Sequence, residues 1–310
     1  MPLKAIDCHV HPWDETSLGF MGAGRLEAMS RYFGRDIKPV PFDELAHTYR
    51  ARDMMAVLLA TDDSTTSGLP PVPNDHVARA VRDFPDVFLA FGGVDPWKGQ
   101  LALDEVRRCK EELGLIGLKF NPGRQHFFPN DPKFARLWQT AADLGLVCLF
   151  HTGMMGNGAG TRGGLGFKLK YTAPVPCLDD IAADYPELTI ISAHPGWPWQ
   201  EEQLAMARHK GNVYLDLSGW APKYFPAQLV QYTRTMLQDR VLFGSDWPVL
   251  TPELAKRRLR RPLPRRRVQG PDEGSDRGFQ RWGVGPRGRG RLLYSTPFSQ
   301  QSPRQEPKLD

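Results

Sequence analysis

No apolar run in this sequence of 310 residues approaches the ~20 residues that a membrane-spanning helix needs. The first residues, MPLKAIDCHVH, also lack the hydrophobic segment of a secretory signal peptide, so we expect a cytoplasmic protein without a membrane partner. Only four cysteines are present and no two form a CxxC pair. This scarcity argues against a disulfide framework and against a structural zinc knuckle.

The sequence also lacks an excess of basic charge over most of its length. The formal net charge is +5, but residues 251–310 hold 15 Lys and Arg against 6 Asp and Glu, which leaves 25 basic and 29 acidic residues in 1–250. A mildly acidic body argues against a broad nucleic-acid-binding face. We therefore expect a small-molecule substrate as the partner. A homodimer is the second association that we consider. Nucleic acid would be a partner only if the basic terminal segment is functional.

Eight short apolar or β-branched runs predict strands at residues 4–10, 54–60, 87–94, 116–120, 146–150, 188–192, 212–217 and 240–243. Most are apolar throughout, as parallel strands covered on both faces are. Helical patterns lie between them at residues 74–84, 101–113, 131–144, 178–184, 199–210 and 227–238. This alternation predicts a (β/α)8 TIM barrel. An open doubly wound sheet is the alternative, but it usually has a glycine-rich phosphate turn after the first strand, where this chain has His-Val-His.

Polar side chains with metal-binding chemistry follow the predicted strands. His9 and His11 end the first strand, and their spacing of two puts both on one face. His151 follows the fifth strand, His194 the sixth and Asp246 the eighth. Because the carboxyl ends of barrel strands converge on one mouth, we expect these groups to meet there. Three imidazoles and one carboxylate suit Zn²⁺, with Mn²⁺ as the other candidate.

Each of these signals also has an ordinary structural explanation. A His-x-His pair is a short motif, and a lone histidine after a strand is often only hydrogen-bonded within the fold. Asp246 precedes Trp247 and Pro248, and it could instead cap the next helix. The metal-site hypothesis therefore depends on the conjunction of the four strand ends. His47, His76 and His209 fall elsewhere, and we expect them to lie at the surface.

The same motifs carry a family resemblance. HVH at residues 9–11, FHTG at 150–153, AHPGWPW at 193–199 and GSDWP at 244–248 resemble the amidohydrolase superfamily in the family's order. The closer resemblance is to the amidohydrolase-related branch that contains aminocarboxymuconate-semialdehyde decarboxylase, and it runs from about residue 4 to about residue 253. It implies that His9, His11, His151 and Asp246 bind one divalent metal ion. It further implies that His194 is a general acid or base, and that Asp246 also accepts a proton.

Lys119 in the fourth predicted strand has two interpretations. In some superfamily members a carboxylated lysine on this strand bridges two metals, whereas this branch resembles one-metal enzymes. We therefore favour an inward lysine that pairs with a carboxylate.

The loops after the fourth and fifth strands are basic, which suits a substrate with a carboxylate or with the phosphates of an acyl-thioester carrier. An aromatic cluster after the sixth to eighth strands could wall in an aromatic or muconate-like substrate, or simply fill the space between helices. A solvated loop would explain the basic residues equally well. The candidate substrate-binding residues are Arg124, His126, Arg162, Lys168 and Trp197.

The terminal segment does not continue the barrel pattern. Residues 251–310 contain 7 Gly and 8 Pro, and no apolar stripe continues past Leu263. We therefore predict a barrel over residues 1–255 with an incomplete or aberrant C-terminal end, and a disordered basic tail over residues 256–310. Two origins are considered for the tail, a functional polyanion-binding segment and a shift of reading frame near residue 255. We favour the frameshift, because the family resemblance stops there in mid-helix.

These observations predict a metal-dependent enzyme of the amidohydrolase-related branch, acting by hydrolysis or by non-oxidative decarboxylation as a carboxy-lyase. Both chemistries use the same ligands in that branch, so the sequence leaves the choice open. The hypothesis of a different class is a catalytically inactive barrel whose basic tail binds a polyanion.

Overall fold

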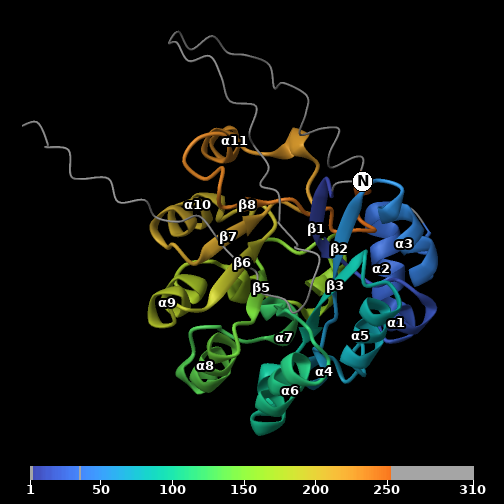
Figure 1. Ribbon diagram of the computed structural model, residues 1–310. Helices are drawn as coiled ribbons and strands as arrows, with labels where there is room; N and C mark the ends of the chain where they lie inside the picture. Colours follow the sequence, from blue (N-terminus) through green and yellow to red (C-terminus); the bar gives the residue numbers. More distant parts are fainter. Residues whose placement is uncertain (1–2, 35, 253–310) are drawn as a thin grey trace, which may run out of the picture.

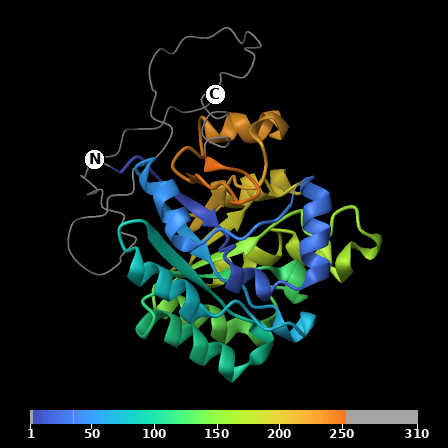
Figure 2. The ribbon, with the colours of Figure 1, turned by 90° about the vertical axis from the view of Figure 1, so that its right-hand side faces the viewer.

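The computed structural model describes residues 3–34 and 36–252. Eight parallel strands lie side by side in chain order, and helices enclose them in both Figure 1 and Figure 2. The (β/α)8 barrel predicted from the sequence is confirmed. The strands are β1 (Ala5–Val10), β2 (Met54–Leu59), β3 (Phe88–Gly93), β4 (Gly117–Phe120), β5 (Val147–His151), β6 (Thr189–Ala193), β7 (Val213–Asp216) and β8 (Val241–Leu242).

Helices connect successive strands along the chain. They are α1 (Glu15–Gly19), α2 (Ala23–Phe33), α3 (Phe42–Arg50), α4 (Ser64–Ser67), α5 (Asn74–Asp83), α6 (Gln100–Glu111), α7 (Pro122–Gln125), α8 (Ala135–Asp143), α9 (Cys177–Asp184), α10 (Gln200–His209) and α11 (Ala227–Thr233). Short 3₁₀ turns are η1 (Pro96–Lys98), η2 (Pro132–Phe134), η3 (Arg162–Gly166), η4 (Leu169–Thr172) and η5 (Pro222–Tyr224). All six predicted helices are present, although the last ends at Thr233 rather than Gln238.

Two apolar layers hold the barrel together. The inner layer is made by side chains that point into the barrel, among them Ile6, Val57 and Leu149. The outer layer joins the opposite faces of the strands to the helices and is the larger cluster. Alternate side chains of one strand supply the two layers, which explains the nearly continuous apolar runs in the sequence.

The barrel closes between β1 and the segment that follows β8. Cys8 N donates to Phe243 O at 3.0 Å and His11 N donates to Trp247 O at 2.9 Å. Val10 and Trp247 form a parallel bridge. We call this junction the seam. The seam is joined although β8 has only two residues. Its side chains, Val241 and Leu242, and the following Phe243 are half-buried.

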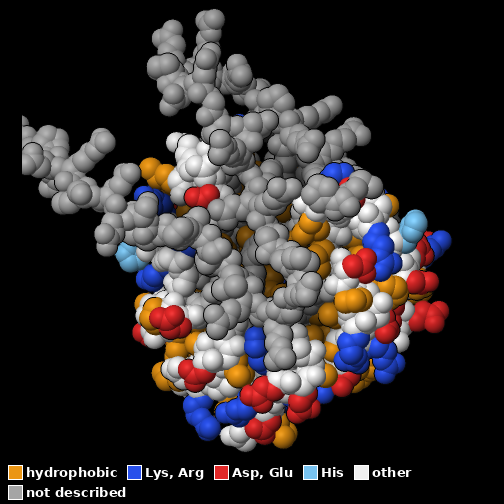
Figure 3. Space-filling model, in the orientation of Figure 1, with side chains coloured by type: hydrophobic (Ala, Val, Ile, Leu, Met, Phe, Trp, Pro, Cys, Tyr) orange, Lys and Arg blue, Asp and Glu red, His pale blue; other side chains and the backbone are white. Residues whose placement is uncertain are grey.

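The predicted boundary at residue 255 and the predicted tail over residues 256–310, including its two proposed origins, lie outside the described residues. Within the described residues no helix is long and apolar enough to cross a membrane. All four cysteines are buried and free, as the absence of a CxxC pair led us to expect. Figure 3 shows acidic and basic side chains intermingled over the lower helices of that view, without a face of one sign there.

Candidate metal centre

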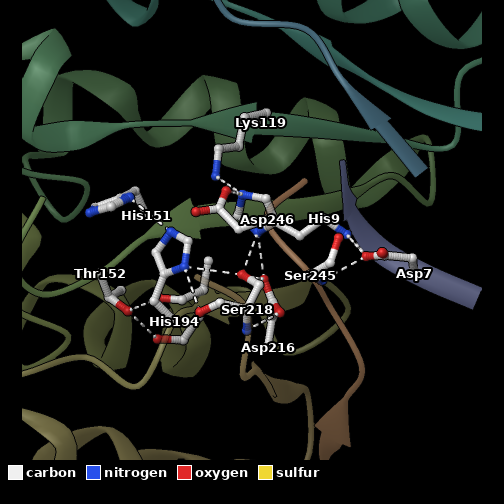
Figure 4. A network of polar contacts seen from close by, with 12 residues as sticks. Asp7, His9, Lys119, His151, Thr152, His194, Asp216, Ser218, Ser245 and Asp246 are labelled. Atoms are coloured by element: carbon white, nitrogen blue, oxygen red, sulfur yellow. Dashed lines mark hydrogen bonds and ion pairs between the residues drawn. The ribbon is translucent and has the colours of Figure 1, made fainter. Parts of the chain in front are cut away.

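Three of the predicted ligands meet at the mouth of the barrel. His9 lies in β1 and its side chain points into the barrel. His11 follows that strand, and Asp246 follows β8. Asp246 Oδ1 lies 3.1 Å from His11 Nε2 and 3.4 Å from His9 Nε2. One ligand atom from each of the three residues lies within 4.8 Å of the other two, close enough to share one ion. Figure 4 shows how the seam brings Asp246 against His9.

A buried carboxylate fixes the orientation of His9. His9 Nδ1 lies 2.5 Å from Asp216 Oδ2 at the end of β7, and both side chains have no exposed surface. Ser218 Oγ donates to the same carboxylate oxygen at 2.8 Å. With Nδ1–H donated to a carboxylate, His9 has an unprotonated Nε2, which lies 3.4 Å from Asp246 Oδ1 and is free to bind a cation shared with that carboxylate. This is the arrangement that orients imidazole ligands in metal sites.

His194 and His151 form a second chain of imidazoles. His194 Nδ1 donates to Ser218 O at 3.1 Å, so its Nε2 accepts a hydrogen from His151 Nδ1, also at 3.1 Å. The remaining nitrogen, His151 Nε2, is then an unprotonated acceptor. It is buried and has no hydrogen-bond partner. An unpartnered buried acceptor is costly, so this atom is suited to a ligand.

His151 does not join the three clustered ligands directly. Its ring lies 4.6 Å from that of His194, which in turn lies 4.8 Å from the ring of His9. His194 is therefore a neighbour of both His151 and His9. The assignment of His151 as a ligand stays a prediction, supported by its free Nε2.

Lys119 points into the barrel from β4, as predicted, and it is 2% exposed. Its Nζ lies 3.4 Å from His9 Nε2, and among the described residues no carboxylate lies within ion-pair distance of it. Burial lowers the pKa of Lys119 to about 8, although Asp246 and Asp216 raise it. Lys119 therefore lies beside the imidazole of His9 rather than in the ion pair with a carboxylate that we expected.

Burial also controls the charge of the neighbouring groups. It lowers the pKa of His194 to about 4, so that imidazole is neutral at pH 7. It raises the pKa of Asp216 to about 7. Burial raises the pKa of Asp246, but the hydrogen bond from His11 and the neighbouring basic groups outweigh burial. The pKa of Asp246 therefore lies below the ordinary value and the group is a carboxylate.

The backbone of two site residues is held in the left-handed region. His194 has φ 67° and Asp246 has φ 59°, conformations that non-glycine residues adopt at a cost of about 1–3 kcal/mol. Gly219 lies against both side chains. A Cβ placed on it would lie 2.9 Å from Asp246 Oδ2 and from His194 Nδ1, so only glycine leaves room for this pair. Such strain is typical of functional sites.

Two members of the cluster, His11 and Asp246, lie on the wall of a cavity. Its polar side includes His11, Lys119, His151, His194 and Asp246. Its apolar side comes mainly from the α1–α2 region and the β5 loop, with Trp13, Phe20, Met21, Met29, Phe33 and Met155. Helices α1, α2 and α3 were not predicted from the sequence, so this apolar wall was not expected.

Arg124 is the predicted substrate-binding residue that lines the cavity. It shares Asp63 with Arg25 of α2: Arg124 reaches Asp63 through two hydrogen bonds of 3.1 Å, and Arg25 through bonds of 2.8 and 3.3 Å. Phe167 covers both guanidinium groups, 5.5 Å from Arg25 and 6.0 Å from Arg124. Two arginines and one carboxylate leave one positive charge beside the cavity.

The other four predicted substrate-binding residues do not line this cavity. His126 Nε2 lies 3.0 Å from Gly166 O, and its ring stacks on Tyr171. Arg162, Lys168 and Trp197 are exposed. Their assignment stays untested. His76, which we expected to lie at the surface, is half-buried, and its Nε2 lies 2.8 Å from Asp14 Oδ2.

Asp216 and Ser218 were not singled out from the sequence. The available signal was a charged residue in the otherwise apolar run NVYLDL, at the carboxyl end of a predicted strand. A buried acid at that end of a barrel strand points into the mouth.

The donor set fits a divalent cation. Two imidazoles and one carboxylate converge, His9 and His151 both present unprotonated Nε2 atoms, and a carboxylate orients His9 from behind. Nitrogen and carboxylate donors suit Zn²⁺ and Mn²⁺.

Comparison with known proteins agrees with the fold. An uncharacterised TIM-barrel protein from Bordetella bronchiseptica has 22% sequence identity and a TM-score of 0.65, over 84% of this chain and 92% of that one. A dihydroxybenzoic acid decarboxylase from Polaromonas sp. JS666, solved with bound manganese and the inhibitor 2-nitroresorcinol, has 20% identity and a TM-score of 0.52, over 82% and 89%.

A curated relative covers less of the chain. The 2-amino-3-carboxymuconate-6-semialdehyde decarboxylase of Dictyostelium discoideum is 28% identical over 78 residues, which are 25% of this chain and 22% of that protein. The family model for amidohydrolases matches residues 6–262, a range that includes all the histidines and carboxylates described above. The chain therefore belongs to the amidohydrolase family.

Proposed function

We propose that this protein is a metal-dependent carboxy-lyase that removes CO₂ from a small aromatic or muconate-like carboxylate. The observation that carries the proposal is the meeting of His9, His11 and Asp246 beside a cavity. His11 and Asp246 line that cavity, which also offers Arg124 and an apolar face. His151, with its free Nε2, is the candidate fourth ligand. The names of the curated relative and of the Polaromonas enzyme favour decarboxylation over hydrolysis.

The cavity suits a substrate with a flat apolar body and more than one polar group. Trp13, Phe20 and Phe33 offer aromatic contacts to a ring or a conjugated chain. Arg124 offers the remaining positive charge of the Arg25–Asp63–Arg124 group to an anionic substituent. The carboxylate that leaves would then face the histidine cluster.

In the proposed reaction the bond between the substrate carbon and its carboxylate breaks, the electron pair stays on the carbon, and a proton replaces CO₂. A bound divalent cation supplies Lewis-acid charge that stabilises the negative charge developed in this step. Neutral His194 takes up a proton from the substrate or from a water molecule beside it. It then gives this proton to the carbon that has lost CO₂. Asp246, adjacent to His11 and His9, is the second group able to accept that proton.

Product analysis tests the proposal. Metal-loaded protein is incubated with a panel of dihydroxybenzoates and with an aryl acyl thioester. Release of CO₂ with one organic product is expected from at least one carboxylate. His194→Asn should abolish the release, whereas His47→Ala, which changes an exposed histidine of α3, should not.

Two other outcomes would contradict the proposal. Cleavage of the thioester into two fragments without CO₂ would establish a hydrolase. Protein that binds no metal and turns over no substrate would favour the catalytically inactive barrel considered from the sequence.

A further inference from the structure

One buried carboxylate beside the site does not face it. Asp7 lies in β1 two residues before His9, but the pairing of β1 with β2 shifts register between Asp7 and Val10. Because of this irregularity His9 points into the barrel while Asp7 points outward, toward α3 and the seam. Asp7 is completely buried. In Figure 4 it lies on the far side of Ser245 from the imidazoles.

Three donors converge on this carboxylate. Oδ1 accepts from Ser245 N at 2.9 Å and from His9 N at 3.2 Å. Oδ2 accepts from the Tyr49 hydroxyl at 2.8 Å. A single side chain thus contacts the backbone of one proposed ligand, the residue immediately before another, and the helix that covers them.

The seam needs such a connection more than the other strand pairs do. β8 is only two residues long, and Asp246 follows it in a strained left-handed conformation. A turn of this kind keeps its geometry only where its surroundings hold it. Ser245 provides part of that support: its amide is held by Asp7, and its Oγ accepts from Trp247 N at 3.0 Å.

We infer that Asp7 is a positioning residue that holds the two halves of the metal site in register across the seam. Oδ1 fixes the backbone of His9 relative to that of Ser245, and so sets the separation between the imidazole of His9 and the carboxylate of Asp246. The inference rests on the metal site proposed above. Tyr49 orients Asp7 from outside but does not contact the ligands.

The test compares zinc affinity with folding stability in three variants of the full chain. Asp7→Ala removes both backbone contacts. Asp7→Asn keeps an oxygen at the Oδ1 position and offers Nδ2–H to the oxygen of Tyr49. Tyr49→Phe removes the hydroxyl that donates to Oδ2 and leaves both backbone contacts of Oδ1 in place. Zinc affinity is measured by competition with a fluorescent chelator, and stability by the midpoint of urea unfolding.

Asp7→Ala should lower zinc affinity roughly 10–100-fold, the range seen when a group that orients metal ligands is removed. Asp7→Asn should bind zinc nearly as well as the wild type. Tyr49→Phe should unfold at lower urea but keep its zinc affinity, and this separation distinguishes positioning from general destabilisation. The absorption spectrum of bound Co²⁺ should change in Asp7→Ala and not in Tyr49→Phe.

Folded Asp7→Ala with wild-type zinc affinity would overturn the inference, as would a loss of affinity in Tyr49→Phe equal to that in Asp7→Ala. If Asp7→Ala does not fold, Asp7→Ser, whose hydroxyl cannot span the same distance, takes its place. Folded Asp7→Asn that loses zinc would also overturn the assigned role of Oδ1. Wild-type protein without zinc affinity would instead overturn the metal site itself.

Discussion

His9 and His11 both approach one oxygen of Asp246, so these two imidazoles are the residues whose loss should empty the site. Purified wild-type protein should contain close to one divalent ion per chain. The double variant His9→Ala, His11→Ala should contain almost none, and His47→Ala should match the wild type. Elemental analysis of the three proteins measures this directly. Full metal content in the double variant would remove the basis of the assignment.

His194 has a different role from the ligands, and a conservative change separates the two. His194→Asn suits the left-handed backbone at φ 67°, since asparagine adopts that region more readily than most residues. The variant should keep its metal and lose about 10²–10⁴-fold in turnover, the range for a group that moves a proton. Metal analysis and steady-state kinetics are run on the same preparation. If the metal is lost along with turnover, His194 is a ligand.

The sequence predicts the site residues that face the barrel interior better than it predicts the residues that hold them in place. His9, His11, His194 and Asp246 follow recognisable strands, and strand ends in a barrel have only one place to converge. Asp7 and Asp216 depend on contacts made across the closed barrel. Nothing local in the sequence specifies that Asp7 meets Ser245 or that Asp216 meets His9.

At the scale of elements, the strands were more predictable than the helices that precede β2. Apolar runs buried on both faces produced all eight strands within about two residues, the usual uncertainty of a boundary. Helices α2 and α3 are preceded by Gly22 and Pro41 at the N-cap position, and neither residue offers a capping side chain. Without that start signal the segment between β1 and β2 remained uninterpreted, although it supplies the apolar wall of the cavity.

Asp63 ties three elements together, because it follows β2 and holds Arg25 of α2 and Arg124 of α7. Burial raises the pKa of Asp63, but the charge and hydrogen bonds of Arg124 and Arg25 outweigh burial and hold it below 3.8. A lowered pKa in the folded state stabilises the protein above the unfolded-state pKa, and that stability is lost as pH falls through the folded-state value.

Asp63→Asn should therefore lower the free energy of unfolding at pH 7 by about 1.5–3 kcal/mol. The difference from the wild type should shrink as pH falls below about 4. Urea unfolding at several pH values tests both statements. Asp43→Asn, which changes an exposed aspartate of α3, is the matched control. A difference that stays constant down to the lowest pH would show that the ion pair does not stabilise the fold.

At the scale of the whole molecule, a bound cation would join the first strand to the last. Its proposed ligands come from both sides of the seam, so binding should stabilise the closed barrel over the unfolded chain. With free ion at 1,000 times its Kd the gain is about 4 kcal/mol. A chelator should lower the thermal midpoint, and Zn²⁺ or Mn²⁺ should restore it.

Hydrogen exchange locates this effect. The amides of Cys8 and His11 donate across the seam and should exchange faster after chelation than amides of the β5–β6 pair. The variant lacking His9 and His11 should show no shift in thermal midpoint on chelation. A shift of equal size in that variant would mean that the cation stabilises the protein from another position.

The span of the Asp7–Ser245 contact has a consequence for how the protein acquires its metal. The two residues are 238 positions apart in sequence, so the site cannot exist until nearly the whole barrel has been synthesised and closed. Contacts of such long range form late, because the entropy of closing the loop must be offset first. A nascent chain that has not reached residue 246 carries two imidazoles at its start but not the carboxylate that completes their group. Metal uptake during synthesis would thus report the last step of folding rather than the first.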